Sequence, residues 1–133
     1  MPEGAVLIDT SVWIEALRED GDPGCKACVD ALAAGRRAAT CEVVAAEVLA
    51  GATSEAHLAE LTVGLRGTSA LDMAGAGYLA GCLALSLRRR GFTIHTTDLL
   101  IAATAHLNGA ALLHRDQHLA KVASVLGLQV IEP

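Results

Sequence analysis

The chain of 133 residues predicts an α/β protein in which helices cover both faces of a short parallel sheet. Short apolar runs alternate along the chain with longer segments of helical periodicity, which is the pattern of repeated strand-helix units. Two of these runs, residues 6–8 and 110–113, lead into polar residues that include an aspartate. Hydrophobic residues make up 53% of the chain and aromatic residues only 2%, so Ala, Leu and Val are expected to build the core.

Length and composition indicate a single domain over residues 1–133. The sequence has no run of about 18 apolar residues that could cross a bilayer, and its first residues lack the basic region of a secretory signal. We therefore expect a cytoplasmic protein with no membrane partner. The net charge of -5 argues against coating nucleic acid through bulk positive charge, although local basic contacts stay available. Four cysteines suit a reducing compartment, where thiols serve as small apolar side chains.

Turn residues and helix-capping residues divide the first half of the chain. Gly, Pro and Asp cluster in residues 19–24, while Gly35 and Gly51 follow the last apolar residues of helical patterns. Asp9, immediately after the first apolar run, is itself a favoured N-cap. The first half is expected to fold as a strand at residues 6–8, helices over 11–18 and 24–34, a strand at 38–40, and helices over 41–50 and 55–65.

The second half repeats this alternation after a weak strand at residues 68–71. Ala and Leu dominate the next segment up to Gly91, which predicts one long helix over residues 72–90. Asp98 falls in the first turn of a strongly apolar helix that ends before Asn108. The remaining elements are expected to be a strand at residues 110–113, a short helix over 118–125 and a last strand at 128–131.

Three acidic residues occupy positions that a parallel sheet brings to one edge: Asp9 and Asp116 follow strands, and Asp98 lies in a first helical turn. A fourth, Glu47, borders the apolar stripe of its helix and needs a partner. Each acid alone also has an ordinary explanation, because carboxylates cap helices well.

Acids that converge in this way need a cation. Carboxylates about 4 Å apart repel by roughly 4 kcal/mol at the effective dielectric near a protein surface. A hard divalent ion reverses that repulsion, and all-oxygen ligation suits Mg²⁺, with Mn²⁺ as a substitute. The set therefore predicts metal-assisted phosphoryl transfer.

Other arrangements compete with the acidic one. Cys25 with Cys28 and His114 with His118 have the spacing of zinc-ligand pairs, although almost the whole domain separates the two pairs. His114 and His118 are also an alternative acid-base pair for a metal-independent ribonuclease. The sequence contains no common Gly-rich phosphate-binding loop.

With four acids in this order, the chain resembles the PIN-domain nucleases, and among them the VapC-type toxins of bacterial type II toxin-antitoxin modules. The ordered set of motifs is fairly specific, although each motif alone is weak. Two residues depart from the family pattern, which commonly has Thr or Ser at His114 and Phe at Leu119. The matching stretches are Asp9-Thr10-Ser11-Val12-Trp13-Ile14, Glu47-Val48-Leu49-Ala50-Gly51, Thr97-Asp98-Leu99-Leu100-Ile101-Ala102-Ala103 and Leu112-Leu113-His114-Arg115-Asp116.

The resemblance implies a three-layer α/β/α fold and a site in which Asp9, Glu47, Asp98 and Asp116 bind metal while Ser11 supplies a hydroxyl. It also implies a Mg²⁺-dependent endoribonuclease that hydrolyses RNA with metal-activated water. The expected partners are a second copy of the chain, forming a homodimer, and a cognate antitoxin that covers the active site. The alternative function is a catalytically silent PIN-like protein-binding module whose acids serve mainly as helix caps.

Overall fold

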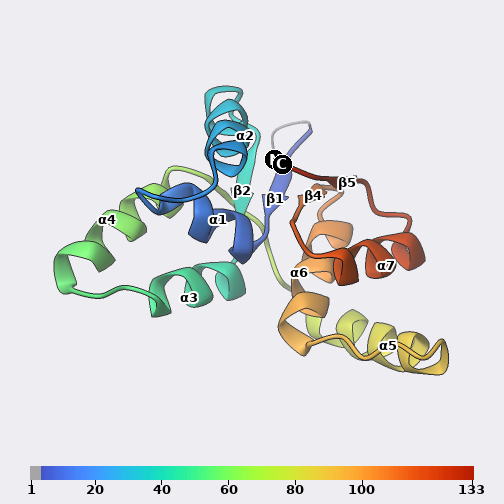
Figure 1. Cartoon of the computed structure of the whole chain (residues 1–133). Coiled ribbons are helices and arrows are strands. Elements are labelled where there is room, and N and C mark those ends of the chain that lie inside the picture. The colour runs from blue at the N-terminus through green and yellow to red at the C-terminus, as the bar shows by residue number, and fades with distance from the viewer. Residues whose placement is uncertain (1–3) are drawn as a thin grey trace.

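The computed structural model describes residues 4–133, and within them five strands and seven helices (Figure 1). The strands are β1 (Val6–Ile8), β2 (Ala38–Thr40), β3 (Ser69–Ala70), β4 (Ala111–Leu113) and β5 (Val130–Ile131). The helices are α1 (Thr10–Leu17), α2 (Pro23–Ala34), α3 (Glu42–Ala50), α4 (Glu55–Arg66), α5 (Ala76–Arg89), α6 (Thr96–Leu107) and α7 (Gln117–Leu126). Among the described residues, none of the helices has both the length and the apolar character needed to cross a membrane.

The five strands form one sheet in the order β3-β2-β1-β4-β5, and every neighbouring pair is parallel. The chain moves outward from β1 to β3 and then crosses back to β4 on the other side of β1. The strand order therefore reverses between β1 and β4. In open parallel sheets, the crevice beyond the carboxyl ends of the strands at such a switch point is the usual place for a ligand.

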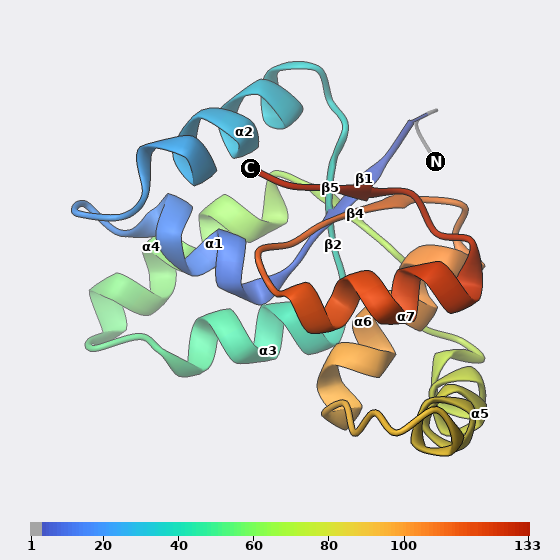
Figure 2. The ribbon, with the colours of Figure 1, turned by 45° about the vertical axis from the view of Figure 1, so that its right-hand side comes forward.

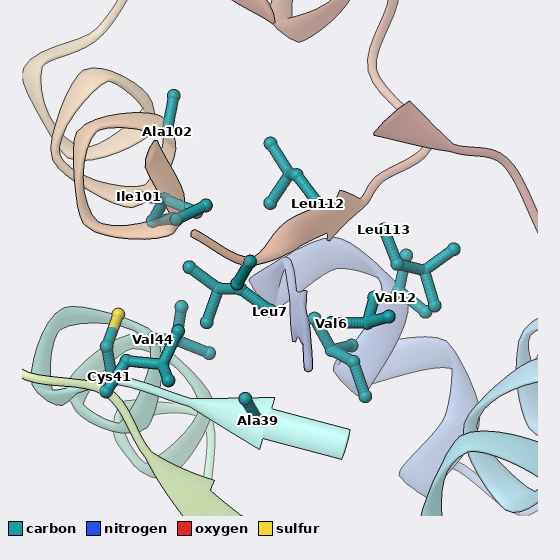
Figure 3. Close-up of a cluster of buried hydrophobic side chains, with 14 of the residues drawn as sticks. Val6, Leu7, Val12, Ala39, Cys41, Val44, Ile101, Ala102, Leu112 and Leu113 are labelled. Carbon is teal, nitrogen blue, oxygen red and sulfur yellow. The ribbon is translucent and has the colours of Figure 1, made fainter. Parts of the chain in front are cut away.

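Both faces of the central strands are buried, which explains why β1 is a continuous apolar run and not an alternating one. Figure 3 shows the two sets of side chains. One face gathers residues of β1, β4, α3 and α6: Leu7, Leu112, Val44 and Ile101. The other face gathers residues of β1, β4 and α1: Val6, Leu113 and Val12. This arrangement confirms the predicted α/β fold with helices on both sides of a parallel sheet.

The carboxyl ends of the strands share one edge because the sheet is parallel. Figure 2 shows α1, α3 and α7 starting beyond this edge, after β1, β2 and β4 respectively. Each of these helices is short, with 8 to 10 residues. The start of each helix is therefore placed directly by the strand before it.

The predicted elements are all present, but the long helix expected over residues 72–90 begins later, at Ala76. The Asp72 carboxylate accepts a hydrogen bond from the backbone N–H of Ala74 (2.9 Å), which closes a local turn. Gly75 then adopts φ +83°, a left-handed conformation that a helix interior excludes. Composition alone could not reveal this turn, because Asp and Gly are two residues among many good helix formers.

The cysteines differ in burial. Cys25 and Cys41 are buried, as small apolar side chains should be. Cys28 is half-buried and Cys82 on α5 is exposed, so Cys82 does not serve as a small apolar side chain in the core.

Candidate functional site

Asp9 lies at the end of the central strand and is the N-cap of α1. Its backbone N–H donates to the carbonyl of Leu113 (2.9 Å), which continues the β1–β4 pairing by one residue. Its Oδ2 accepts hydrogen bonds from the backbone N–H (3.3 Å) and the hydroxyl (2.5 Å) of Ser11. Asp9 is only 4% exposed. Ser11 therefore holds the carboxylate of Asp9 in one orientation at the switch point of the sheet.

Glu47 has the partner that its position on the border of the apolar stripe requires. The hydroxyl of Thr10 donates a 2.8 Å hydrogen bond to Glu47 Oε1. Thr10 begins α1, whereas Glu47 lies in the second turn of α3. Val44 and Val48 are buried on the same helix and hold it against the core. The turn of residues 9–11 thus orients two carboxylates, one through each hydroxyl.

Asp98 lies in the first turn of α6 and is half-buried. Its pKa is raised, first by burial and then by the negative charges of Asp9, Asp116 and Glu47, while His95 opposes the shift. Both causes disfavour the charged form of the carboxyl group. The structure therefore brings the four predicted acids close enough for three of them to act electrostatically on the fourth.

Asp116 is the N-cap of α7, and its Oδ1 accepts a hydrogen bond from the backbone N–H of His118 (2.9 Å). Asp116 and Asp98 line the same cavity of about 100 Å³, together with Thr93, Ile94, His95 and His118. On its other side Asp116 borders an open hollow of about 520 Å³, which it shares with Ser11, Arg115, Gln117 and His118. Asp116 therefore joins the acidic cavity to a larger groove on the surface.

Three of the four acids lie at helix N-termini: Asp9 at α1, Asp98 at α6 and Asp116 at α7. The partial positive charge of a helix N-terminus stabilises a nearby carboxylate. Capping and clustering are therefore compatible explanations of the same residues. The helix dipoles offset part of the mutual repulsion, but the raised pKa of Asp98 shows that they do not remove it.

The donor atoms of this site suit a hard divalent cation, because carboxylate and hydroxyl oxygens are its preferred ligands. Burial and, after it, the negative charges of Asp9, Asp116 and Glu47 raise the pKa of Asp98, and a cation would offset those charges. Within residues 4–133, no three side chains of His, Cys, Asp or Glu are already placed to ligate one ion together. The side chains therefore fit such an ion by their chemistry.

The competing arrangements receive less support. His114 is 1% exposed, whereas His118 is on the surface, so the two imidazoles do not face substrate together. Neither ring nitrogen of His114 has a hydrogen-bond partner in the part of the chain that the structure describes. Cys25 and Cys28 both lie on α2, and the described residues hold no three-ligand zinc set.

Two residues at this edge escaped the sequence analysis as site residues. Thr10 reads as an ordinary helix-start residue, yet its hydroxyl orients Glu47. His95 reads as a solvated histidine, yet it lines the cavity of Asp98 and Asp116. In the sequence, only the position of Thr10 next to Asp9 could have suggested its role. Nothing in the sequence suggested His95, because only the fold of the segment before α6 brings this residue to the acids.

Comparisons with known proteins identify the family. The PIN domain family matches residues 6–125. VapC ribonuclease Mb1587 of Mycobacterium bovis and Ribonuclease VapC11 of Mycobacterium tuberculosis are each 34% identical over 129 residues, covering 93% of this chain and 96% of theirs. The same fold occurs in a chain of the crystal structure of VapBC2 from Rickettsia felis bound to a promoter DNA fragment. The TM-score is 0.80 and the identity 20%, and the match covers 97% of this chain and 98% of that chain. The protein therefore belongs to the PIN-domain family and, within it, to the VapC-type proteins.

Proposed function

We propose that this protein is a metal-dependent endoribonuclease that acts as the toxin of a toxin-antitoxin pair and hydrolyses RNA phosphodiester bonds. The observation that carries the proposal is the gathering of Asp9, Glu47, Asp98 and Asp116 at the switch point of the sheet, where burial first and then the charges of the other three acids raise the pKa of Asp98. A cluster of like charges is costly unless it serves to bind a cation. The names of the two relatives, both ribonucleases, support RNA as the substrate.

Each acid has a role in this proposal. Asp9 and Asp98 would hold the principal Mg²⁺, and Glu47 and Asp116 would complete the acidic pocket. When bound, such an ion supplies charge stabilisation and activates water for an in-line displacement at phosphorus. The hydroxyls of Ser11 and Thr10 orient the carboxylates of Asp9 and Glu47 before the ion arrives. Water is the nucleophile.

The ends of the products distinguish this mechanism from the histidine-pair alternative. Attack by water on the phosphodiester leaves a 5′-phosphate and a 3′-hydroxyl. A His114–His118 mechanism working through the ribose hydroxyl leaves a cyclic phosphate instead. The burial of His114 supports the first outcome.

We also propose a cognate antitoxin as the partner that covers the acidic edge, and a homodimer as the assembled form. The Rickettsia felis structure is a VapBC2 assembly on promoter DNA, which supports a partner of this kind for the present chain. The same proposal places the protein in the cytoplasm, with its RNA substrate.

Calorimetric titration of Mn²⁺ into the purified, antitoxin-free protein tests the metal site without knowledge of the RNA. We expect the wild type to bind and Asp98→Asn to lose binding. Asp30→Asn is the matched control, because Asp30 is an exposed carboxylate on α2. Binding that survives in Asp98→Asn would overturn the metal assignment, and a wild type that does not bind would favour the silent protein-binding module.

Cleavage tests the catalytic part of the proposal. Asp9→Asn should abolish metal-dependent RNA cleavage while its circular dichroism spectrum stays that of the wild type. Full activity in the pure Asp9→Asn protein, or products that end in cyclic phosphate, would contradict the mechanism.

A further inference from the structure

We propose that His95 and His118 hold a backbone phosphate of the RNA, next to the phosphate that is cleaved. This inference rests on the proposed ribonuclease function and adds to it a pair of residues that position the substrate.

The two histidines line one small cavity. His95 comes from the segment before α6, and His118 comes from the first turn of α7. Both side chains are exposed, and both line the cavity of about 100 Å³ that contains Asp98 and Asp116. A group that occupies this cavity beside Asp98 and Asp116 is therefore also beside the two imidazoles.

The walls of the cavity are tied to each other. Lys121 on α7 lies with its Nζ 3.8 Å from the centre of the Phe92 ring, at the start of the segment that carries His95. Lys121 is three residues after His118, so the two side chains share a face of α7. This cation–π contact keeps the two imidazoles at a limited range of spacings and adds a positive charge near the cavity.

The chemistry of the cavity suits a phosphate on the imidazole side. A neutral imidazole has one N–H donor, so phosphate binding does not require either histidine to be charged. The first turns of α6 and α7 also begin here, and helix N-termini attract phosphate oxygens. The two carboxylates alone would repel a phosphate, so the phosphate proposed here contacts the histidines and not the acids, which would hold the cation.

The adjoining hollow supplies a path for the rest of the strand. It has a volume of about 520 Å³ and shares Asp116 and His118 with the small cavity. Arg115 lines it and pairs with Glu15 at 3.3 Å, with 42% of the Arg115 side chain exposed. A single strand can therefore run from Arg115 over Asp116 to His95 and pass the acids on the way.

The test is the equilibrium binding of a fluorescein-labelled, single-stranded RNA of mixed sequence, measured by anisotropy in Ca²⁺, with a gel to verify that the RNA stays intact. His95→Ala and His118→Ala should each weaken binding by about 10- to 150-fold, the size expected for one hydrogen bond to a charged group. His118→Asn, which keeps an N–H donor, should retain part of the affinity. His106→Ala is the control, because His106 is exposed at the far end of α6 and lines a different hollow.

Methylphosphonate substitution identifies the phosphate. Replacing one phosphate at a time by the neutral group should reveal a single position that weakens wild-type binding and has no further effect in His95→Ala or His118→Ala. Equal effects at every position in the wild type and the variants would overturn the proposal, as would unchanged RNA binding in both alanine variants. Either result leaves the proposed function intact, because that function depends on Mn²⁺ binding and on the loss of cleavage in Asp9→Asn.

Discussion

The hydroxyl of Thr10 donates a 2.8 Å hydrogen bond to Oε1 of Glu47, 37 positions later in the chain. Thr10 stands between Asp9 and Ser11, whose hydroxyl binds the Asp9 carboxylate. The residues at the start of α1 thus orient two acids: Asp9, which directly follows β1, and Glu47 on the neighbouring helix α3. The geometry of this part of the site depends on two uncharged hydroxyls.

Thr10→Val tests the bond to Glu47 with a side chain of nearly the same shape. We expect unfolding free energy to fall by about 1 kcal/mol, the typical net value of one hydrogen bond. Affinity for Mn²⁺ should also fall, because Glu47 is then free to adopt other rotamers. Urea unfolding and calorimetry measure the two effects. Thr10→Ser keeps the hydroxyl and should stay close to the wild type. A loss in Thr10→Ser with none in Thr10→Val, which keeps the methyl group, would mean that packing of the methyl group, and not the hydrogen bond, matters.

Ser11→Ala removes the hydroxyl from Asp9 and leaves the backbone N–H bond in place. Loss of a group that orients a metal ligand typically costs about 10- to 100-fold in metal affinity or activity. We expect a loss in that range in both Mn²⁺ titration and RNA cleavage. Wild-type metal affinity in Ser11→Ala would show that the Asp9 carboxylate is oriented by the backbone alone.

Asp98→Asn should stabilise the metal-free protein at neutral pH. The folded-state pKa of Asp98 is raised by burial and by Asp9, Asp116 and Glu47, so its charged form destabilises the fold. This penalty is present above the raised pKa and disappears as pH falls through it, because the wild-type carboxyl then takes up a proton. We expect a higher Tm for Asp98→Asn than for the wild type at pH 7, with a difference that shrinks toward pH 4.

Thermal unfolding over this pH range, with EDTA present, measures the gain. Saturating Mn²⁺ should reverse the order of the two proteins, because the ion stabilises only the protein that binds it. A constant difference between Asp98→Asn and the wild type at all pH values would contradict the electrostatic explanation.

Gly21→Ala tests the turn between α1 and α2. A Cβ at this position would lie 1.8 Å from the carbonyl oxygen of Glu15, so the backbone of the turn must shift. We expect a loss of about 1 to 3 kcal/mol of unfolding free energy, as for other overpacked sites. Gly81→Ala on α5 meets no atom within 4 Å and should instead gain about 0.5 to 1 kcal/mol. Urea denaturation of the two variants should therefore give opposite signs.

Local sequence signals were sufficient to predict most elements of this fold. β1 was recognisable as an apolar run that ends at Asp9, and α6 as an apolar helix with Asp98 in its first turn. The predicted start of α5 was wrong, because a hydrogen bond to Asp72 and the left-handed conformation of Gly75 form a turn in a segment whose composition favours a helix. The expected homodimer and the cytoplasmic location stay predictions.

The sequence by itself determined the order of strands and helices, the four acids and the family, because each depends on residue types and spacings within short stretches. Only the tertiary structure decided which residues surround those acids. The bond from Thr10 to Glu47, the burial of His114 and the place of His95 beside Asp98 all depend on how separate elements pack. Such contacts form where helices cross the sheet and pack against one another. The residue pattern within a single helix or strand does not specify which other element it packs against.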